Sequence, residues 1–271
     1  PDLVPAWLLL GNAERMRDNL PQAEAAYRQA IARAPLDHDT RFNLGLVLLQ
    51  QAQFVESEAL MRQLVQENSN DPDAWAVLGG AMHAQARMTE AIEAMRRSVA
   101  IRPNPTTHSK MLVALHYDAS YGPEQILAEH RTWNATYARE VTPLPPPLVQ
   151  PIRAGRQLRI GFVALDFSGG PSGCLGLRAL ECLDKSACSV VCYSDRVAED
   201  EFTNRFRKAA DVWHVSMGLS DAELAQLARR DEIDVLVDMG GHVGRRLLTF
   251  AQRPAALQVT WLGYTGTTGL Q

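Results

Sequence analysis

Two different patterns of apolar and polar residues divide the chain. Up to about residue 140, apolar residues recur three or four positions apart, the spacing that places them on one face of an α-helix. From residue 158 onward, short and nearly continuous apolar runs alternate with helical stretches. Runs of this kind are typical of strands buried on both faces of a parallel sheet. The pattern therefore predicts an all-α first part followed by an α/β second part.

The helical part contains a repeat of 34 residues. Gly11, Gly45 and Gly79 lie 34 residues apart, and each follows a leucine. The other repeated positions are the fourth residue before the glycine (Trp7, Arg41, Trp75), a small residue (Ala23, Ser57, Ala91), a large apolar residue (Tyr27, Met61, Met95) and a closing proline in two copies (Pro35, Pro103). These positions match the tetratricopeptide signature, in which small residues let two antiparallel helices approach and proline ends the second helix. We expect helix pairs over residues 1–104, with no strand among them.

Residues 105–157 are predicted to connect the repeats to the second part. A helix is expected after the turn at residues 121–124, with Ile126, Leu127, His130 and Trp133 on roughly one face. The proline-rich residues 142–147 are predicted to be a stiff extended linker and the clearest domain boundary. We expect the histidines of the connecting helices to be packed and those of the repeat region to be solvated; the latter are His38, His83 and His108.

Residues 158–271 are predicted to form a doubly wound, Rossmann-like parallel sheet. Strands are expected at 158–165, 189–193, 211–215, 233–237 and 257–261, and helices at 175–183, 199–210, from 220, and at 245–252. Three glycine-rich polar loops follow strands, at residues 166–173, 238–242 and 263–269. Parallel strands bring such loops to one edge of the sheet, where ligands bind, and glycines let backbone donors approach a ligand. The sequence predicts a ligand cleft there, with simple turns as the alternative for each loop.

Three side chains in these loops are candidates for chemistry. His242 can act as a base, orient a ligand or bind phosphate, or it can be a hydrogen-bonded loop histidine. Asp166 and Asp238 can serve as acids or bases, or can cap the helix that follows each loop. No loop matches a Walker A or G-x-G-x-x-G phosphate-binding motif.

Composition narrows the classes of partner and location. The formal net charge of −4 over 271 residues gives no support for nucleic acid or an anionic membrane surface as a partner. No apolar run approaches the roughly 18 residues needed to span a bilayer. The spacing of the four cysteines (Cys174, Cys182, Cys188, Cys192) matches no zinc motif. We therefore expect buried thiols in a reduced, cytoplasmic protein, and no metal site.

The most specific motif lies near the end of the chain. Residues 253–269, RPAALQVTWLGYTGTTG, resemble the R-P-A-P-x-Q-x-x-W-x-G-Y-P-G-T-[ST]-G segment of protein O-GlcNAc transferases. Residues 233–242 resemble the I-D-I-L-V-D-L-x-G-H/Y segment of the same family, and residues 158–163 with Asp166 and Phe167 resemble the start of its catalytic region. With the repeats, the similarity to bacterial, repeat-containing members of this GT41 family covers nearly the whole chain.

This resemblance implies a fold and a reaction. The family has the two-lobed GT-B fold and transfers a sugar, here GlcNAc, from a UDP-sugar to Ser or Thr of a protein, with inversion and without metal or other cofactor. The repeat groove would guide the acceptor protein. His242 and Asp166 each follow an expected parallel strand, and we predict catalytic roles for them. The residues predicted to bind the substrate or donor are Phe167, Gly170, Pro171, Gly173, Tyr264, Gly266, Thr267 and Thr268.

The chain also departs from the family pattern. Gly170 stands where the family carries a histidine, so the sugar-polarising role of that histidine is not transferred. Ala256 and Thr265 replace family prolines. A second lobe with most donor contacts is expected to follow residue 271, so this chain alone is not expected to transfer sugar. The alternatives are an O-fucosyltransferase of the SPINDLY type, a bacterial N-glucosyltransferase, and a non-enzymatic repeat adaptor.

Overall fold

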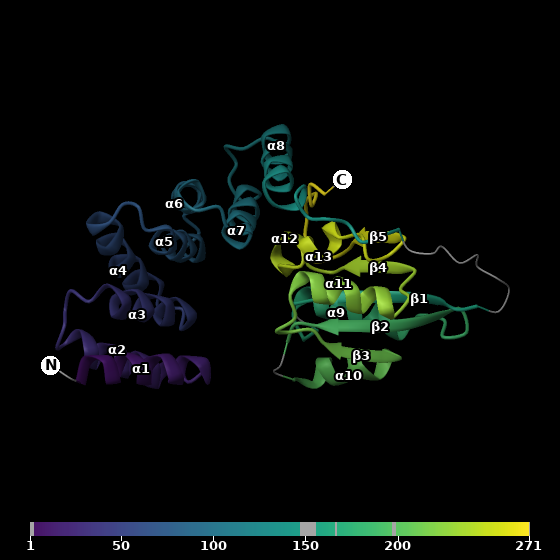
Figure 1. Ribbon diagram of the computed structural model, residues 1–271, viewed down its shortest axis with the longest axis horizontal. Coiled ribbons are helices and arrows are strands. Elements are labelled where there is room, and N and C mark those ends of the chain that lie inside the picture. Colours follow the sequence, from purple (N-terminus) through teal and green to yellow (C-terminus); the bar gives the residue numbers. More distant parts are fainter. Residues whose placement is uncertain (1–2, 147–155, 166, 197–198, 271) are drawn as a thin grey trace. The chain divides into compact units, whose positions relative to one another are not determined.

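The computed structural model describes residues 3–146, 156–165, 167–196 and 199–270, which form two compact units, 1–121 and 122–271 (Figure 1). This division lies within the predicted connecting segment and before the proline-rich stretch. Two backbone groups of that stretch bond to later residues of the second unit: the Leu144 N–H donates to the Gln252 carbonyl at 2.7 Å, and Arg229 donates to the Pro145 carbonyl at 2.6 Å. The described part of the stretch is thus held within the second unit.

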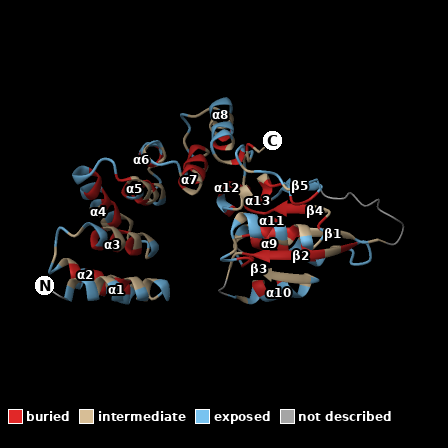
Figure 2. Cartoon of the chain, viewed as in Figure 1, coloured by how far each residue is buried: buried red, intermediate tan, exposed pale blue. Residues whose placement is uncertain are grey.

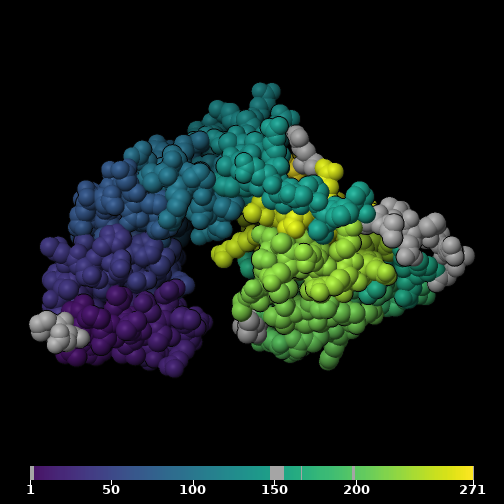
Figure 3. Space-filling view, in the orientation of Figure 1, coloured from purple at the N-terminus to yellow at the C-terminus, as the bar shows by residue number. Residues whose placement is uncertain are grey.

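The first unit is built from helices. They are α1 Leu3–Met16, α2 Leu20–Ile31, α3 His38–Gln50, α4 Phe54–Glu67, α5 Pro72–Ala84, α6 Met88–Ile101 and α7 Pro105–Leu115. Each of these helices packs against the next one along the chain. The colour accordingly changes gradually over the surface of this unit in Figure 3. The described residues of this unit contain no strand, so the predicted helical repeats are confirmed.

The repeated glycines make the same contact in each copy. A Cβ atom would lie 2.4 Å from Tyr27 at Gly11, 2.3 Å from Met61 at Gly45 and 2.6 Å from Met95 at Gly79. The glycine of the first helix therefore makes room for the large apolar residue of the second helix in the same repeat. Leu78, which precedes Gly79, is 1 % exposed, so the predicted burial of this leucine is confirmed.

The turn inside each repeat has a feature that the sequence does not signal. Asp18, Ala52 and Ala86, again 34 residues apart, have φ angles of 60°, 60° and 59°. The left-handed conformation costs a residue with a Cβ about 1–2 kcal/mol, so each repeat contains one unfavourable backbone position at its turn.

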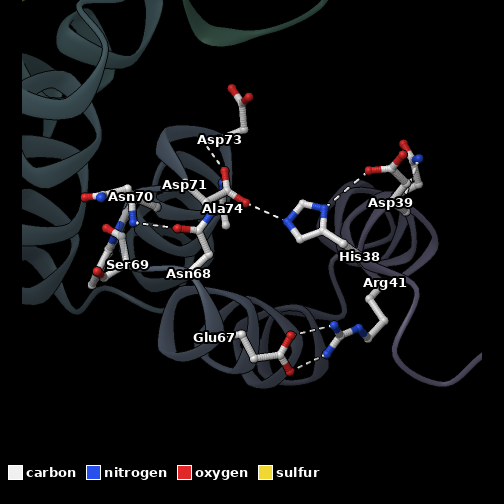
Figure 4. Close-up of polar contacts among 12 residues, drawn as sticks. His38, Asp39, Arg41, Glu67, Asn68, Ser69, Asn70, Asp71, Asp73 and Ala74 are labelled. Atoms are coloured by element: carbon white, nitrogen blue, oxygen red, sulfur yellow. Dashed lines mark hydrogen bonds and ion pairs between the residues drawn. The ribbon is translucent and has the colours of Figure 1, made fainter.

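Polar contacts form both within the middle repeat and between it and the next repeat (Figure 4). Arg41, in the slot that holds tryptophan in the other copies, is 5 % exposed and donates to both carboxylate oxygens of Glu67 at 2.7 and 2.6 Å. His38 Nε2 lies 2.7 Å from the carboxylate of Asp71, and Asp71 also caps α5 by accepting from the N–H groups of Asp73 and Ala74. An ion pair between the buried Arg41 and the half-exposed Glu67 thus takes the place of the indole at the middle copy.

The second unit begins with α8 Pro123–Trp133 and the π-helix η1 Asn134–Ala138, followed by alternating strands and helices. The strands are β1 Leu158–Ala164, β2 Cys188–Ser194, β3 Val212–Val215, β4 Val235–Asp238 and β5 Leu257–Thr260. The helices are α9 Pro171–Glu181, α10 Glu201–Ala209, α11 Asp221–Arg230, α12 Gly241–Gly244 and α13 Leu247–Ala251. All strand pairs are parallel in the order β3-β2-β1-β4-β5, which confirms the predicted doubly wound sheet.

Helices cover both faces of this sheet. Because successive residues of a strand point to opposite faces, each face contributes to a different hydrophobic cluster. Phe162 belongs to a cluster with Leu177 of α9 and Phe206 of α10. Its neighbour Val163 belongs to a second cluster with residues of α11 and α13. Strand β2 and the carboxyl-terminal parts of β1 and β4 are buried, whereas the edge strands β3 and β5 are more exposed (Figure 2).

Several details differ from the sequence-based predictions. Helix α9 begins at Pro171 rather than near residue 175, because proline is favourable at the first helical position and Gly170 supplies the extended residue before it. The second loop contains α12. His108 is 3 % exposed, not solvated, because it lies on the packed face of α7. Cys174 and Cys182 are exposed, and only the two cysteines of β2 are buried.

Candidate active site

The carboxyl ends of three neighbouring strands lie side by side. Val163 of β1 pairs with Asp238 of β4, and Asp238 pairs with Thr260 of β5. The loops that follow these strands therefore start from one edge of the sheet, which is where open α/β sheets bind ligands.

The second and third loops pack directly against each other. A Cβ atom on Gly263 would lie 2.0 Å from the carbonyl oxygen of Met239, and one on Gly241 would lie 2.6 Å from Cβ of Tyr264. His242 Nε2 lies 3.0 Å from the carbonyl oxygen of Thr268. The predicted meeting of His242 with the loop at residues 264–268 is confirmed. Asp166, the third member of the predicted constellation, lies outside the described residues.

Asp238 stabilises the turn after β4. Its side chain is 3 % exposed and accepts hydrogen bonds from the N–H groups of Gly240 and Gly241, at 2.9 Å each. Burial raises the pKa of Asp238 above its ordinary value, while these two backbone bonds act in the opposite direction. Of its two predicted uses, this geometry corresponds to the capping one.

His242 is buried inside an aromatic cluster. It is 3 % exposed, and its ring centroid lies 4.9 Å from that of His130, 5.0 Å from that of Trp133 and 5.3 Å from that of Tyr264. Because the Thr268 carbonyl can only accept, Nε2 of His242 carries a proton and donates it to this bond. The histidine thus links the second loop to the third; an acid or base role for it stays a prediction.

The first loop divides into buried and open positions. Phe167 is fully buried between Phe206 and Trp213, with ring centroids 4.9 and 5.1 Å away. Its side chain therefore belongs to the core, whereas the sequence predicts that it contacts a ligand. A Cβ atom on Gly173 would lie 1.8 Å from the carbonyl oxygen of Ser168, so this glycine is required by close packing. By contrast, a Cβ atom on Gly170 would have nothing within 4 Å.

The third loop offers hydroxyl groups at the edge of the sheet. Thr267 is exposed, while Tyr264, Gly266 and Thr268 are partly exposed. The hydroxyl oxygen of Thr267 accepts from the N–H of Gly269 at 3.2 Å, which leaves its own O–H able to donate to a ligand. Burial raises the pKa of Tyr264, so its phenol is neutral near pH 7.

Helix α8 contributes to this site in a way that the sequence did not indicate. His130 and Trp133 were predicted to share one face of a helix, but no spacing or motif indicated that this face would pack on loops more than a hundred residues later.

Metal clusters and membrane spans are both missing from the described residues. No group of three or more His, Cys, Asp or Glu side chains there is arranged to hold a metal ion. In the same part of the chain, no helix is long and apolar enough to cross a membrane.

Comparison with known families matches both units. The model of Glycosyl transferase family 41 matches residues 134–271, and a tetratricopeptide repeat model matches residues 8–72 and 42–104. The chain belongs to glycosyl transferase family 41. This assignment agrees with the sequence resemblance and with the helical repeats followed by a parallel sheet.

The relatives of this family 41 member are named as peptide N-acetylglucosaminyltransferases. The chain is 35 % identical to a probable enzyme of this kind, SPINDLY of Hordeum vulgare, over 167 residues that cover 59 % of the chain and 17 % of the relative. It is 33 % identical to the enzyme of Caenorhabditis elegans over 123 residues, 44 % of the chain and 10 % of that relative.

A solved mutant of the Thermobaculum terrenum O-GlcNAc transferase is similar over 98 % of the chain and 52 % of its own length, with 33 % identity and a TM-score of 0.89. The chain thus spans about half of this relative and a fifth or less of the two curated ones.

Proposed function

We propose that this chain supplies the repeats and one sheet lobe of an enzyme that transfers GlcNAc from a UDP-sugar to Ser or Thr side chains of proteins. The observation that supports this most is the similarity to the solved O-GlcNAc transferase over 98 % of the chain. The loops at the carboxyl edge of the sheet lie within residues 134–271, which match the family model. The cytoplasm is the proposed location, because the four cysteines are free thiols, as is usual in reducing compartments.

The proposed reaction exchanges one bond to the sugar for another. The acceptor hydroxyl oxygen bonds to the anomeric carbon, the bond from that carbon to the diphosphate breaks, UDP leaves with the electron pair, and the hydroxyl proton passes to a base. We propose that Thr267, Thr268 and backbone groups near Gly170, Pro171 and Gly266 contact the donor, without metal or other cofactor.

His242 and Asp166 are the proposed acid or base groups. His242→Ala is expected to lower kcat by ~10²–10⁴-fold if the imidazole moves a proton. A loss below about threefold would assign His242 to holding the loops, since a proton-transfer group contributes far more than that.

The acceptor protein is proposed to bind along the repeats. A groove there is formed by α4, α5 and α6 and combines apolar side chains with charged ones. Its lining includes Trp75, Leu78, Met82, Arg62 and Arg97. This mixture suits a polypeptide with both apolar and polar side chains.

The test is a transfer assay with the full-length gene product. Radiolabelled UDP-GlcNAc should label acceptor proteins, and mild alkali should release the label, because sugars on Ser or Thr oxygen are eliminated whereas sugars on Asn nitrogen are not. A parallel assay with a labelled fucosyl donor separates the SPINDLY-type alternative. Binding of acceptor peptides without transfer from either donor would overturn the proposal in favour of a repeat adaptor.

Gly170 provides a more specific test of the site. Because nothing lies within 4 Å of an added Cβ, Gly170→His should fold like the parent protein. We expect it to raise kcat, since it restores the family histidine beside the proposed donor site. Gly170→Gln, which adds a polar chain of similar size without an imidazole, is the control and should not raise kcat.

A further inference from the structure

Helix α8 packs on the candidate site although it precedes the sheet in sequence. His130 is completely buried and Trp133 is 2 % exposed. Gly269 of the third loop passes so close that a Cβ atom there would lie 2.4 Å from the carbonyl oxygen of His130, and its φ is +73°. The backbone of α8 therefore limits where the third loop can run.

The hydrogen bonds of His130 define its proton positions. Nδ1 lies 2.7 Å from the carbonyl oxygen of Ile126, and Nε2 lies 2.7 Å from the hydroxyl oxygen of Tyr264. A carbonyl can only accept, so Nδ1 carries the proton. In the neutral ring, Nε2 then accepts, and the Tyr264 hydroxyl must donate to it.

The two histidines hold the third loop at two separate points. His130 binds the side chain of Tyr264 near the start of the loop, and His242 binds the backbone of Thr268 near its end. Their rings meet edge to face, with centroids 4.9 Å apart. Gly266 and Thr267, proposed to contact the donor, lie between these two points.

We propose that His130 is a positioning residue for sugar transfer: by accepting the Tyr264 hydroxyl proton, it fixes the orientation of the loop that contacts the donor. The positioning of the loop depends only on the contacts above, while its effect on catalysis rests on the function proposed for this chain. With its proton held by His130, the Tyr264 hydroxyl can only accept a hydrogen bond from a donor sugar.

Two substitutions of similar size separate the two hydrogen bonds of His130. In His130→Gln, the side-chain oxygen can reach the place of Nε2 and accept from Tyr264. In His130→Asn, the shorter amide can reach Ile126 but not Tyr264. Tyr264→Phe removes the same bond from the other side, and His116→Asn, in the repeat unit, is the control for changing a histidine elsewhere.

The first measurement is amide hydrogen exchange of residues 262–270 in this chain. We expect exchange to accelerate about tenfold in His130→Asn and in Tyr264→Phe, as for the loss of one buried hydrogen bond. Exchange should stay near the parent rate in His130→Gln and in the His116→Asn control. The double variant His130→Asn/Tyr264→Phe should be no faster than either single variant, because both remove the same bond.

The second measurement is kcat and KM of the full-length enzyme. His130→Asn and Tyr264→Phe should lower kcat about tenfold with little change in the acceptor KM, and His130→Gln should recover most of the loss. If the parent enzyme transfers no sugar, the proposed function fails, but hydrogen exchange still tests the loop positioning. Equal behaviour of the Asn and Gln variants, unchanged exchange in Tyr264→Phe, or additive effects in the double variant would overturn the role of His130.

Discussion

In the first unit, which contains the repeats, Gly79 lies against Met95 of the next helix in the same repeat. In the second unit, which contains the sheet, Gly263 of the loop after β5 lies against the carbonyl oxygen of Met239, which follows β4. Both glycines allow close packing, but the first contact is local and recurs in three copies. The second contact follows no repeat and joins two loops of the candidate site. The nearest atom to an added Cβ is thus a side-chain atom at Gly79 but a backbone oxygen at Gly263, and a backbone atom can move only if its loop moves.

The largest effect is expected from shortening a buried leucine of the repeats. Leu78→Ala should lower the free energy of unfolding by about 2–5 kcal/mol, because Leu78 is 1 % exposed and packs in the core. Leu10 holds the same repeat position but is 44 % exposed, so Leu10→Ala should change stability by less than about 0.5 kcal/mol. Urea unfolding of both variants measures the difference, and equal losses would show that burial does not distinguish the copies.

The next effect concerns the sheet unit. Gly263→Ala should destabilise the protein by about 1–3 kcal/mol or more, because the new Cβ would meet a backbone oxygen at 2.0 Å. Gly170→Ala in the same unit meets nothing within 4 Å and should be nearly neutral. Thermal unfolding compares the two; a neutral Gly263→Ala would mean that the two loops can separate at little cost.

A smaller effect is expected at two adjacent glycines of α5. Gly79→Ala places its Cβ 2.6 Å from Met95 Cγ and 3.1 Å from the Ala91 carbonyl oxygen, so it should destabilise by about 1–2 kcal/mol. Gly80→Ala meets only Leu49, at 3.4 Å, and should stabilise the helix by about 0.5–1 kcal/mol. Both substitutions raise the helix propensity by the same amount. If the free energy of unfolding, measured with urea, falls for Gly79→Ala and rises for Gly80→Ala, the difference comes from the contact of residue 79 with Met95.

The smallest effect is a pH dependence in the repeats. Burial lowers the pKa of His38, but its hydrogen bonds to Asp71 and Asp39 and their negative charges raise it more, so the net shift is upward. A raised pKa means that the contribution to stability is complete below the ordinary pKa of about 6.5 and is lost as the pH rises through the folded-state value. The side chain is 45 % exposed, so solvent screening keeps the contribution below about 1 kcal/mol.

The measurement for this prediction is urea unfolding of the parent protein and of His38→Ala at pH 6 and pH 8. The parent should be more stable than the variant at pH 6, and the difference should shrink at pH 8. A stability difference that grows with pH would contradict an upward shift of the His38 pKa.

The sequence by itself determined the elements and their order. The 34-residue spacing of Gly11, Gly45 and Gly79 was sufficient for the helix pairs, and apolar runs were sufficient for the strands of the parallel sheet. The physical reason is that these features depend on contacts between residues at regular spacing, which sequence periodicity records. The edge at which the three loops gather followed from the parallel topology alone.

Only the tertiary structure decided how individual side chains are used. It placed Phe167 in the core, paired Arg41 with Glu67, and brought His130 to Tyr264, a residue 134 positions away. Such contacts obey no spacing rule, because they depend on how whole helices and loops pack. A histidine on a helical face has the same local pattern whether that face meets a neighbouring helix or a loop of the candidate site.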